Sequence, residues 1–324
     1  MANIKRSSWI RAGVSVTLLG TAVFVLRARL SEVEPADVFH RLRELPTWRL
    51  VVAIALTVFN YVQLTLYDVV GLAYLRRSLP YRRVALASFV ATAFGHSLGF
   101  SFASSGSVRY RYFSAWGLST GEIAGLIAFG SLTYLAGFAW VAGAVLLVAQ
   151  ERMGPLLPVD PALLRGVGAA LLLLGLGYVG LSVFGPSVVT HKGKKFELPR
   201  PLLVLGQIFV SGCDWLVMAG ILKLLLPAEV LDYTSLLRVL VLAQVAGTLS
   251  QVPGGLGVFE SLMVTALTPA LSTSAVLGTL LFYRVFYFFI PFAVAIVLFS
   301  LNELRRRVSD APPPIRVQGG STQT

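Results

Sequence analysis

Residues 95–99, Gly-His-Ser-Leu-Gly, have the G-x-S-x-G spacing that presents a serine nucleophile in lipases and esterases. That chemistry needs a strand-to-helix turn before the serine and a histidine that is oriented by an acid. The residues before Ser97, VALASFVATAF, do not alternate as a strand would, and the one downstream histidine, His191, lies in a lysine-rich segment. We therefore interpret the small residues as allowing close packing of membrane helices, and we do not expect Ser97 to hydrolyse esters.

A second small-residue motif, PGGLG at residues 253–257, has the composition of a glycine loop that cradles phosphate. It lacks the Lys-Ser/Thr of a P-loop and a preceding strand, so nucleotide binding is not expected. Pro253 instead removes a backbone donor, and Gly254, Gly255 and Gly257 weaken helix continuity. We expect a helix to unwind at this motif and to restart after it, with Glu260 in the second turn that follows.

The residues that usually bind metals are few and scattered. His40, His96 and His191 lie far apart in the sequence, and the lone Cys213 lies in an apolar run. A metal cluster needs ligands at short spacings, and an internal disulfide needs two cysteines. The sequence therefore predicts no metal site, no internal disulfide and no cofactor.

Asp68, Asp214, Glu260 and Arg284 are charged residues that lie well inside apolar runs. Arg284 is about nine residues into its run, roughly 14 Å deep at 1.5 Å per residue, and Asp214 is similarly central. Because charges within a membrane are costly, they should face the protein interior and find partners. We expect Glu260 to pair with Arg284, either on a substrate path or as a lock between two helices. Asp68 and Asp214 could instead be satisfied by nearby tyrosine or tryptophan donors.

Two further groups of polar residues could line a binding site. Asn60, Gln63 and Tyr67 form a stripe at helical spacing, which fits a cavity wall or hydrogen bonds between helices. Arg109 and Arg111 lie among aromatic residues in SSGSVRYRYFSAWGLS, residues 104–119. Guanidinium groups suit phosphate oxygens, although an aromatic belt at the membrane surface would explain the same composition.

The elements that position these residues must be membrane helices. Of 324 residues, 56% are hydrophobic and 13% are charged, and the mean hydropathy is +0.77. Soluble domains carry about 25% charged residues. Each apolar run approaches or exceeds the ~20 residues that cross a bilayer, and the alternation of a barrel is absent. The runs cover residues 8–26, 49–75, 84–108, 122–149, 162–185, 201–226, 235–268 and 275–300.

The net charge of +12 is concentrated in four clusters at the ends of these runs. The clusters lie at residues 5–11, 76–83, 192–195 and 305–307. They are expected on the cytoplasmic side, and no cluster is built like a nucleic-acid-binding module. The first run lacks a cleavage site, so we expect it to be retained as a span.

Clusters on one side must be separated by an even number of crossings, but three apolar runs separate the second cluster from the third. Three runs also separate the third from the fourth. We therefore predict an all-α polytopic integral membrane protein with six full spans. Runs 84–108 and 235–268 would be broken, re-entrant elements in inverted orientation, an arrangement typical of transporters. An eight-crossing topology stays open. Residues 1–308 form one domain, both termini are cytoplasmic, and residues 309–324 form a disordered Pro/Gly-rich tail.

Three segments resemble the membrane domain of the bacterial lysylphosphatidylglycerol synthase/flippase family, the multiple peptide resistance factors. They are GSVRYRYFSAWGLS (residues 106–119), VPGGLGVFE (residues 252–260) and LLFYRVFYFFIP (residues 280–291). The resemblance implies a flippase that moves aminoacylated phosphatidylglycerol, or a related phospholipid, from the inner to the outer leaflet of the bacterial cytoplasmic membrane. Such activity confers resistance to cationic antimicrobial peptides. The matching residues are Arg109, Pro253, Gly254, Gly255, Gly257, Glu260 and Arg284.

Full-length members of that family continue into a soluble acyltransferase domain, whereas this sequence ends in a Pro-rich tail. We therefore expect no enzyme activity, and either a separate synthase makes the lipid or the substrate is another lipid. In this interpretation Arg109, Arg111 and the helix start after Gly255 hold the phosphate, and Glu260 or Asp214 offsets an amine. Two alternatives are an ion- or proton-coupled transporter of a small polar solute and a membrane scaffold for a lipid-modifying transferase. The oligomeric state, including a homo-oligomer, stays open.

Overall fold

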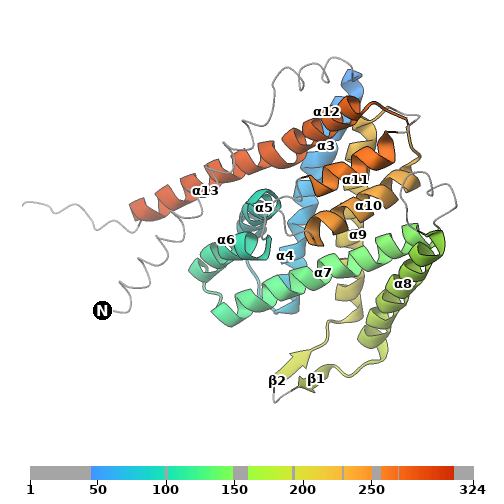
Figure 1. Cartoon of the computed structure of the whole chain (residues 1–324). Helices are drawn as coiled ribbons and strands as arrows, with labels where there is room; N and C mark the ends of the chain where they lie inside the picture. Colours follow the sequence, from blue (N-terminus) through green and yellow to red (C-terminus); the bar gives the residue numbers. More distant parts are fainter. Residues whose placement is uncertain are drawn as a thin grey trace, which may run out of the picture.

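The computed structural model describes residues 45–98, 101–148, 160–191, 194–227, 230–249, 257–268 and 270–309. These ranges are almost entirely helical (Figure 1). Several expectations lie outside them, namely the first span, the positions of Pro253, Gly254 and Gly255, and the tail beyond Ser309.

The first described span consists of α3 (Thr47–Leu64) and α4 (Leu66–Tyr74), which follow one another with only Thr65 between them. Its polar residues, among them Asn60, Gln63 and Asp68, are buried, while valines such as Val51 and Val58 are exposed. A water-soluble helix would show the opposite pattern. The stripe predicted from the sequence thus faces the protein interior, as polar groups of a membrane helix must.

Five of the described helical stretches are long and apolar enough to cross a membrane: Thr47–Tyr74, Thr120–Leu147 (α7), Pro161–Phe184 (α8), Pro201–Leu225 (α9) and Thr273–Arg305. They correspond to five of the six predicted full spans. The last stretch contains α12 (Thr273–Arg284), a π-helical segment η3 (Val285–Phe289) and most of α13 (Ile290–Ser309).

The starts of these spans follow from local sequence signals. Ser119 accepts a hydrogen bond from the backbone N–H of Glu122, whose carboxylate in turn accepts from the Ser119 N–H, so α7 begins with a capping box. Asp160 caps α8, and a proline follows it at the first helical position. Proline is tolerated there because its missing N–H would have no helical partner.

The two runs that were predicted to be broken are pairs of helices. Run 84–108 gives α5 (Tyr81–Leu98) and α6 (Ser101–Ala115), and run 235–268 gives α10 (Tyr233–Leu249) and α11 (Val258–Leu267). The members of each pair pack side by side (Figure 1). Because two residues separate α5 from α6, that pair must be a tight hairpin that returns the chain to the side it came from.

Gly95, Gly99 and residues 104–107 are the small residues expected to interrupt the first run. α5 ends at Leu98, directly before Gly99, whereas Gly95 lies within α5. Residues 104–107, Ser-Ser-Gly-Ser, lie inside α6 and do not interrupt it. A Cβ added at Gly106 would lie 3.4 Å from Ile127 Cδ1, so this glycine lies beside α7.

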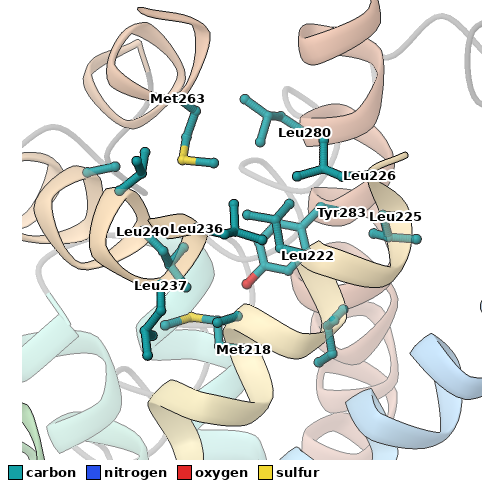
Figure 2. Close-up of a cluster of buried hydrophobic side chains, with 14 of the residues drawn as sticks. Met218, Leu222, Leu225, Leu226, Leu236, Leu237, Leu240, Met263, Leu280 and Tyr283 are labelled. Carbon is teal, nitrogen blue, oxygen red and sulfur yellow. The ribbon is translucent and has the colours of Figure 1, made fainter. Parts of the chain in front are cut away.

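Two aromatic and aliphatic clusters hold the helix pairs in place. Figure 2 shows the first, where Leu222 of α9, Leu237 of α10, Met263 of α11 and Tyr283 of α12 meet. In the second, Phe94 of α5 packs edge-on against Phe292 of α13, with ring centroids 5.3 Å apart. Each broken pair is therefore packed against part of the α12–η3–α13 stretch.

A small β-hairpin departs from the all-α expectation. Strands β1 (Val188–His191) and β2 (Lys194–Glu197) pair antiparallel between α8 and α9, with Val188 opposite Glu197 (Figure 1). The Glu197 carboxylate also forms an ion pair with Arg76, with 2.9 Å between Oε2 and Nη2. The second and third basic clusters therefore lie at the same end of the molecule, as the count of crossings requires.

Candidate functional site

Glu260 and Arg284 form the ion pair that the sequence predicted. The Arg284 Nε donates to Glu260 Oε1 at 2.5 Å, and its Nη2 contacts the same oxygen. Only 11% and 18% of the two side chains are exposed. The other carboxylate oxygen accepts the backbone N–H of Gly257 at 2.8 Å. Glu260 thus joins the start of α11 to the end of α12.

Gly257 is the residue from which α11 restarts, and its φ of +79° explains why a glycine stands there. An L side chain at this φ would bring its Cβ against the backbone, whereas glycine has none. Glu260, three residues later, accepts the Gly257 N–H, which is the glutamate half of a capping box. The predicted restart after the motif is therefore confirmed, although Glu260 lies in the first turn of α11 and not in the second. Gly254 and Gly255 lie outside the described residues.

The helix changes from α-helical to π-helical hydrogen bonding immediately after Arg284. Pro291 has no N–H, so it cannot donate to the carbonyl of Tyr287 as an α-helical residue would. The N–H of Ile290 bonds to the carbonyl of Val285, five residues back, and this π-helical spacing defines η3. Single π turns are frequent at functional sites. Arg284 thus lies at the junction between a regular helix and a π-helical turn.

Asp214, on α9, is the centre of a buried polar network. Its carboxylate accepts from Asn60 Nδ2 at 3.0 Å and from the Tyr67 hydroxyl at 3.4 Å. The Asn60 carbonyl oxygen accepts in turn from the Tyr287 hydroxyl at 2.6 Å. Gln63 donates to the carbonyl of Val210 on α9. The network therefore connects α3, α4 and α9 to the π-helical segment.

Arg109 is bound by Asp68, a pairing that sequence reasoning missed. The Arg109 Nε lies 2.8 and 3.1 Å from the two Asp68 oxygens, and Ser88 Oγ donates to the same carboxylate at 2.5 Å. The Asp68 side chain is 1% exposed. The signal was present in the sequence, since an acid inside an apolar run needs a polar or charged partner, but it did not indicate that the partner is Arg109.

Arg111 makes a separate ion pair. Its Nη2 lies 2.6 Å from Glu303 Oε2 on α13, with both side chains about nine-tenths buried. Residues two apart on a helix point in different directions, so Arg109 and Arg111 reach different neighbours. The structure therefore does not bring these two arginines together around one phosphate.

The other motifs raised by the sequence have structural roles. Ser97 lies inside α5 rather than at a strand-to-helix turn, so the geometry of a nucleophile elbow is absent from this segment. The ring of His96 is surrounded by those of Tyr61, Tyr287 and Phe288, at centroid distances of 6.4, 6.4 and 5.9 Å. Within the described ranges, no three His, Cys, Asp or Glu side chains gather into a set that could hold a metal ion.

The fold and this interior define a polytopic helical membrane protein with charged and polar groups paired between its helices. No family model matches the sequence. The chain is 33% identical to the uncharacterized protein slr0712 of Synechocystis over 296 residues, which cover 90% of this chain and 91% of that protein. It is 30% identical to the inner membrane protein YbhN of Escherichia coli over 283 residues, 87% and 88% of the two chains. The chain therefore belongs to the YbhN-like inner membrane proteins.

A shorter part of the chain is similar to a protein whose name specifies a lipid. Over 94 residues the chain is 31% identical to phosphatidylglycerol lysyltransferase of Staphylococcus haemolyticus. The match covers 28% of this chain and 11% of that protein.

Proposed function

We propose that this protein moves a phospholipid headgroup across the bacterial inner membrane, with aminoacylated phosphatidylglycerol, carried from the inner to the outer leaflet, as the leading candidate. The observation that supports it most directly is the Glu260–Arg284 pair, which is mostly buried and lies beside two helix interruptions. The headgroup of that lipid carries a phosphate and an ammonium group, which are the chemical complements of the two side chains.

The mechanism is an exchange of ion pairs. When a headgroup enters, the Glu260–Arg284 pair opens, Arg284 binds the phosphate oxygens, and Glu260 binds the amine. Opening the pair without a ligand would leave two poorly solvated charges, which costs several kcal/mol. A ligand with both charges removes that cost, because each side chain keeps a partner, while the acyl chains remain in the lipid.

The start of α11 supports the same assignment. Its first N–H groups have no partner within the helix, and the helix dipole adds partial positive charge at this end. A phosphate at Arg284 would therefore lie close to a second source of positive potential. The partial similarity to a phosphatidylglycerol lysyltransferase agrees with a phosphatidylglycerol lipid as cargo. The basic clusters favour cytoplasmic termini.

A reconstituted assay tests this function. Vesicles containing lysylphosphatidylglycerol in both leaflets are treated with an impermeant amine reagent, which labels only the outer leaflet. With the protein present, the labelled fraction should rise well beyond the outer-leaflet share, as inner lipid moves outward. Glu260→Gln and Arg284→Ala should slow this movement at least tenfold. Outer-leaflet labelling in cells carrying the same variants provides the second readout.

Two exposed residues give matched controls. Glu197→Gln and Arg200→Ala remove the same functional groups away from the pair, and they should transport like the unaltered protein. Unchanged movement in Glu260→Gln and Arg284→Ala, at normal protein levels, would overturn the proposal.

A second candidate function is an ion- or proton-coupled transporter of a small polar solute. It is favoured by Asp214, a buried acid whose partners are all neutral. Solute flux into protein-only vesicles that depends on pH or sodium, without lipid movement, would support this candidate over the first.

A further inference from the structure

Asp214 differs from the other buried acids in its partners. Asp68, Glu260 and Glu303 each lie in an ion pair with an arginine. The partners of Asp214 are an amide and a phenol, and within the described ranges no lysine or arginine comes within ion-pair distance. Three acids are therefore compensated by fixed cations, and this fourth one is not.

The position of Asp214 is also the deepest of the four within a span. It lies thirteen residues after the first residue of α9 and eleven before the last, so both ends are about 16–20 Å away. The residue is only 9% exposed. An isolated carboxylate at such depth is costly, whereas a neutral carboxylic acid is much less so. Taking up a proton makes the Asp214 side chain neutral and so removes most of this cost.

The ionisable side chains that interact with Asp214 provide no positive charge, so a proton is the cation available to it. They are the phenols of Tyr61 on α3, Tyr67 on α4, Tyr134 on α7, Tyr283 on α12 and Tyr287 on η3, together with the neighbouring Cys213. Phenols and thiols are neutral at physiological pH.

The remaining helices that pack against α9 are α8 and α10, and their polar groups are directed elsewhere. Tyr178 of α8 donates to Gln207 at 2.6 Å. Arg238 of α10 donates to the carbonyls of Val145 and Val148 at the end of α7. Neither group compensates a charge at Asp214.

The hydrogen bonds around Asp214 favour a proton over a metal cation. The Asn60 amide and the Tyr67 hydroxyl each donate to one carboxylate oxygen, so a sodium ion would have to compete with two donated hydrogens. A proton needs a smaller change, because the Tyr67 hydroxyl only has to turn for its oxygen to accept the new O–H.

The same hydrogen-bond network connects Asp214 to the helix that carries Arg284. Asn60 binds Asp214 with its NH₂ group and Tyr287 with its carbonyl oxygen. Tyr287 is the third residue after Arg284, within the π-helical segment. A change of charge at Asp214 therefore alters the hydrogen bonds that hold the segment carrying Arg284.

We propose that Asp214 is a proton-binding site, and that its protonation controls the opening of the Glu260–Arg284 pair. The coupling to lipid rests on the proposed function, whereas the binding of a proton does not. Two measurements separate the two claims.

Infrared difference spectroscopy tests proton binding without any transported substrate. A pH titration of the purified protein should reveal the C=O band of a protonated carboxylic acid, which disappears on deprotonation. Labelling aspartate carboxyls with ¹³C should shift this band in the unaltered chain. Asp214→Asn should lack the band, and Asp214→Glu should regain one. The matched control is Asp160→Asn, an exposed helix cap that should keep the band, since Asn caps as well as Asp. A band that persists unchanged in Asp214→Asn, or fails to shift with labelled aspartate, overturns the proposal.

Transport under an imposed pH gradient tests the coupling. In vesicles with lysylphosphatidylglycerol, a gradient should change the rate of lipid movement severalfold for the unaltered protein and for Asp214→Glu. Asp214→Asn should move lipid at one rate regardless of the gradient. Lipid movement that ignores the gradient in the unaltered protein overturns the coupling. If the unaltered protein moves no lipid under any condition, the proposed function fails, and the infrared titration alone decides whether Asp214 binds a proton.

Discussion

The hydroxyl of Tyr61 on α3 donates a hydrogen bond to the backbone carbonyl of Tyr287, at a distance of 3.0 Å. This donor takes the place of the N–H that Pro291 lacks, so a side chain from one span completes the backbone of another. A buried carbonyl without a donor costs about 1–3 kcal/mol. The π-helical segment therefore depends on Tyr61.

We predict that Tyr61→Phe lowers the free energy of unfolding by about 1–3 kcal/mol. Thermal unfolding in one detergent measures the effect. Tyr110→Phe, at a 41% exposed position, is the control and should change little. Pro291→Ala restores the missing N–H, so the cost of Tyr61→Phe should shrink in that background. Equal costs in both backgrounds would show that the hydroxyl does not replace the proline's absent donor.

The Asp68–Arg109 pair should be strongly coupled because Asp68 is almost fully buried. Arg109→Ala leaves a buried carboxylate without its cation and should destabilise the protein by about 3–5 kcal/mol. The double variant Asp68→Asn with Arg109→Ala should cost less than the sum of the two single changes, by more than about 1 kcal/mol. A double-mutant cycle in unfolding measures this coupling.

The exposed Arg76–Glu197 pair is the matched comparison for that cycle, since its side chains are 71% and 54% exposed. Exposed pairs contribute about 0–1 kcal/mol, so Arg76→Ala should change unfolding only slightly. Similar coupling energies for the buried and the exposed pair would contradict the assignment.

The contact between α7 and α9 should tolerate no side chain at Gly137. A Cβ built there would lie 2.2 Å from Ser211 Cβ, so Gly137→Ala should push the two helices apart and destabilise the protein by about 1–3 kcal/mol. Gly130→Ala, on the same helix with nothing within 4 Å of its Cβ, should be neutral or stabilising. Unfolding of the two variants, measured side by side, checks the prediction, and equal stabilities would refute it.

One part of the stability should depend on acid pH through Asp232, which precedes α10 outside the spans. Hydrogen bonds from the Ser235 hydroxyl and backbone N–H lower the pKa of this carboxyl from its ordinary 3.8 to about 2. Because the folded value is the lower one, the ionised group stabilises the fold above about pH 4. That contribution is lost as the pH falls from about 4 to about 2. The stability difference between the unaltered protein and Asp232→Asn should therefore shrink over this window, and a constant difference would argue against it.

The apolar runs predicted most of the fold because a membrane helix must be long and must contain its own hydrogen bonds. The two broken runs were predicted from the number of apolar runs between the basic clusters. The Glu260–Arg284 pair was predicted because one acid and one arginine lie in adjacent elements. Pro291 inside a span was a visible signal for the π-helical segment and was not used.

The remaining features depend on tertiary packing that spacing does not encode. Asp68 and Arg109 are separated by 41 residues, and Arg111 and Glu303 by 192. Each arginine had several acids as formal candidates, so only the tertiary placement of α6, which packs against α5 and α7, selects the partners. The β-hairpin was hidden because the lysine-rich stretch at residues 192–195 was interpreted as the mark of a membrane boundary.

The two ion pairs of α6 restrict how this protein can change shape. Sliding α6 on its own would strip Asp68 and Glu303 of their cations, so α4, α6 and α13 must travel as one rigid body. The Glu260–Arg284 pair places the corresponding restraint on α11, because a shift of α11 relative to α12 would separate those two charges as well.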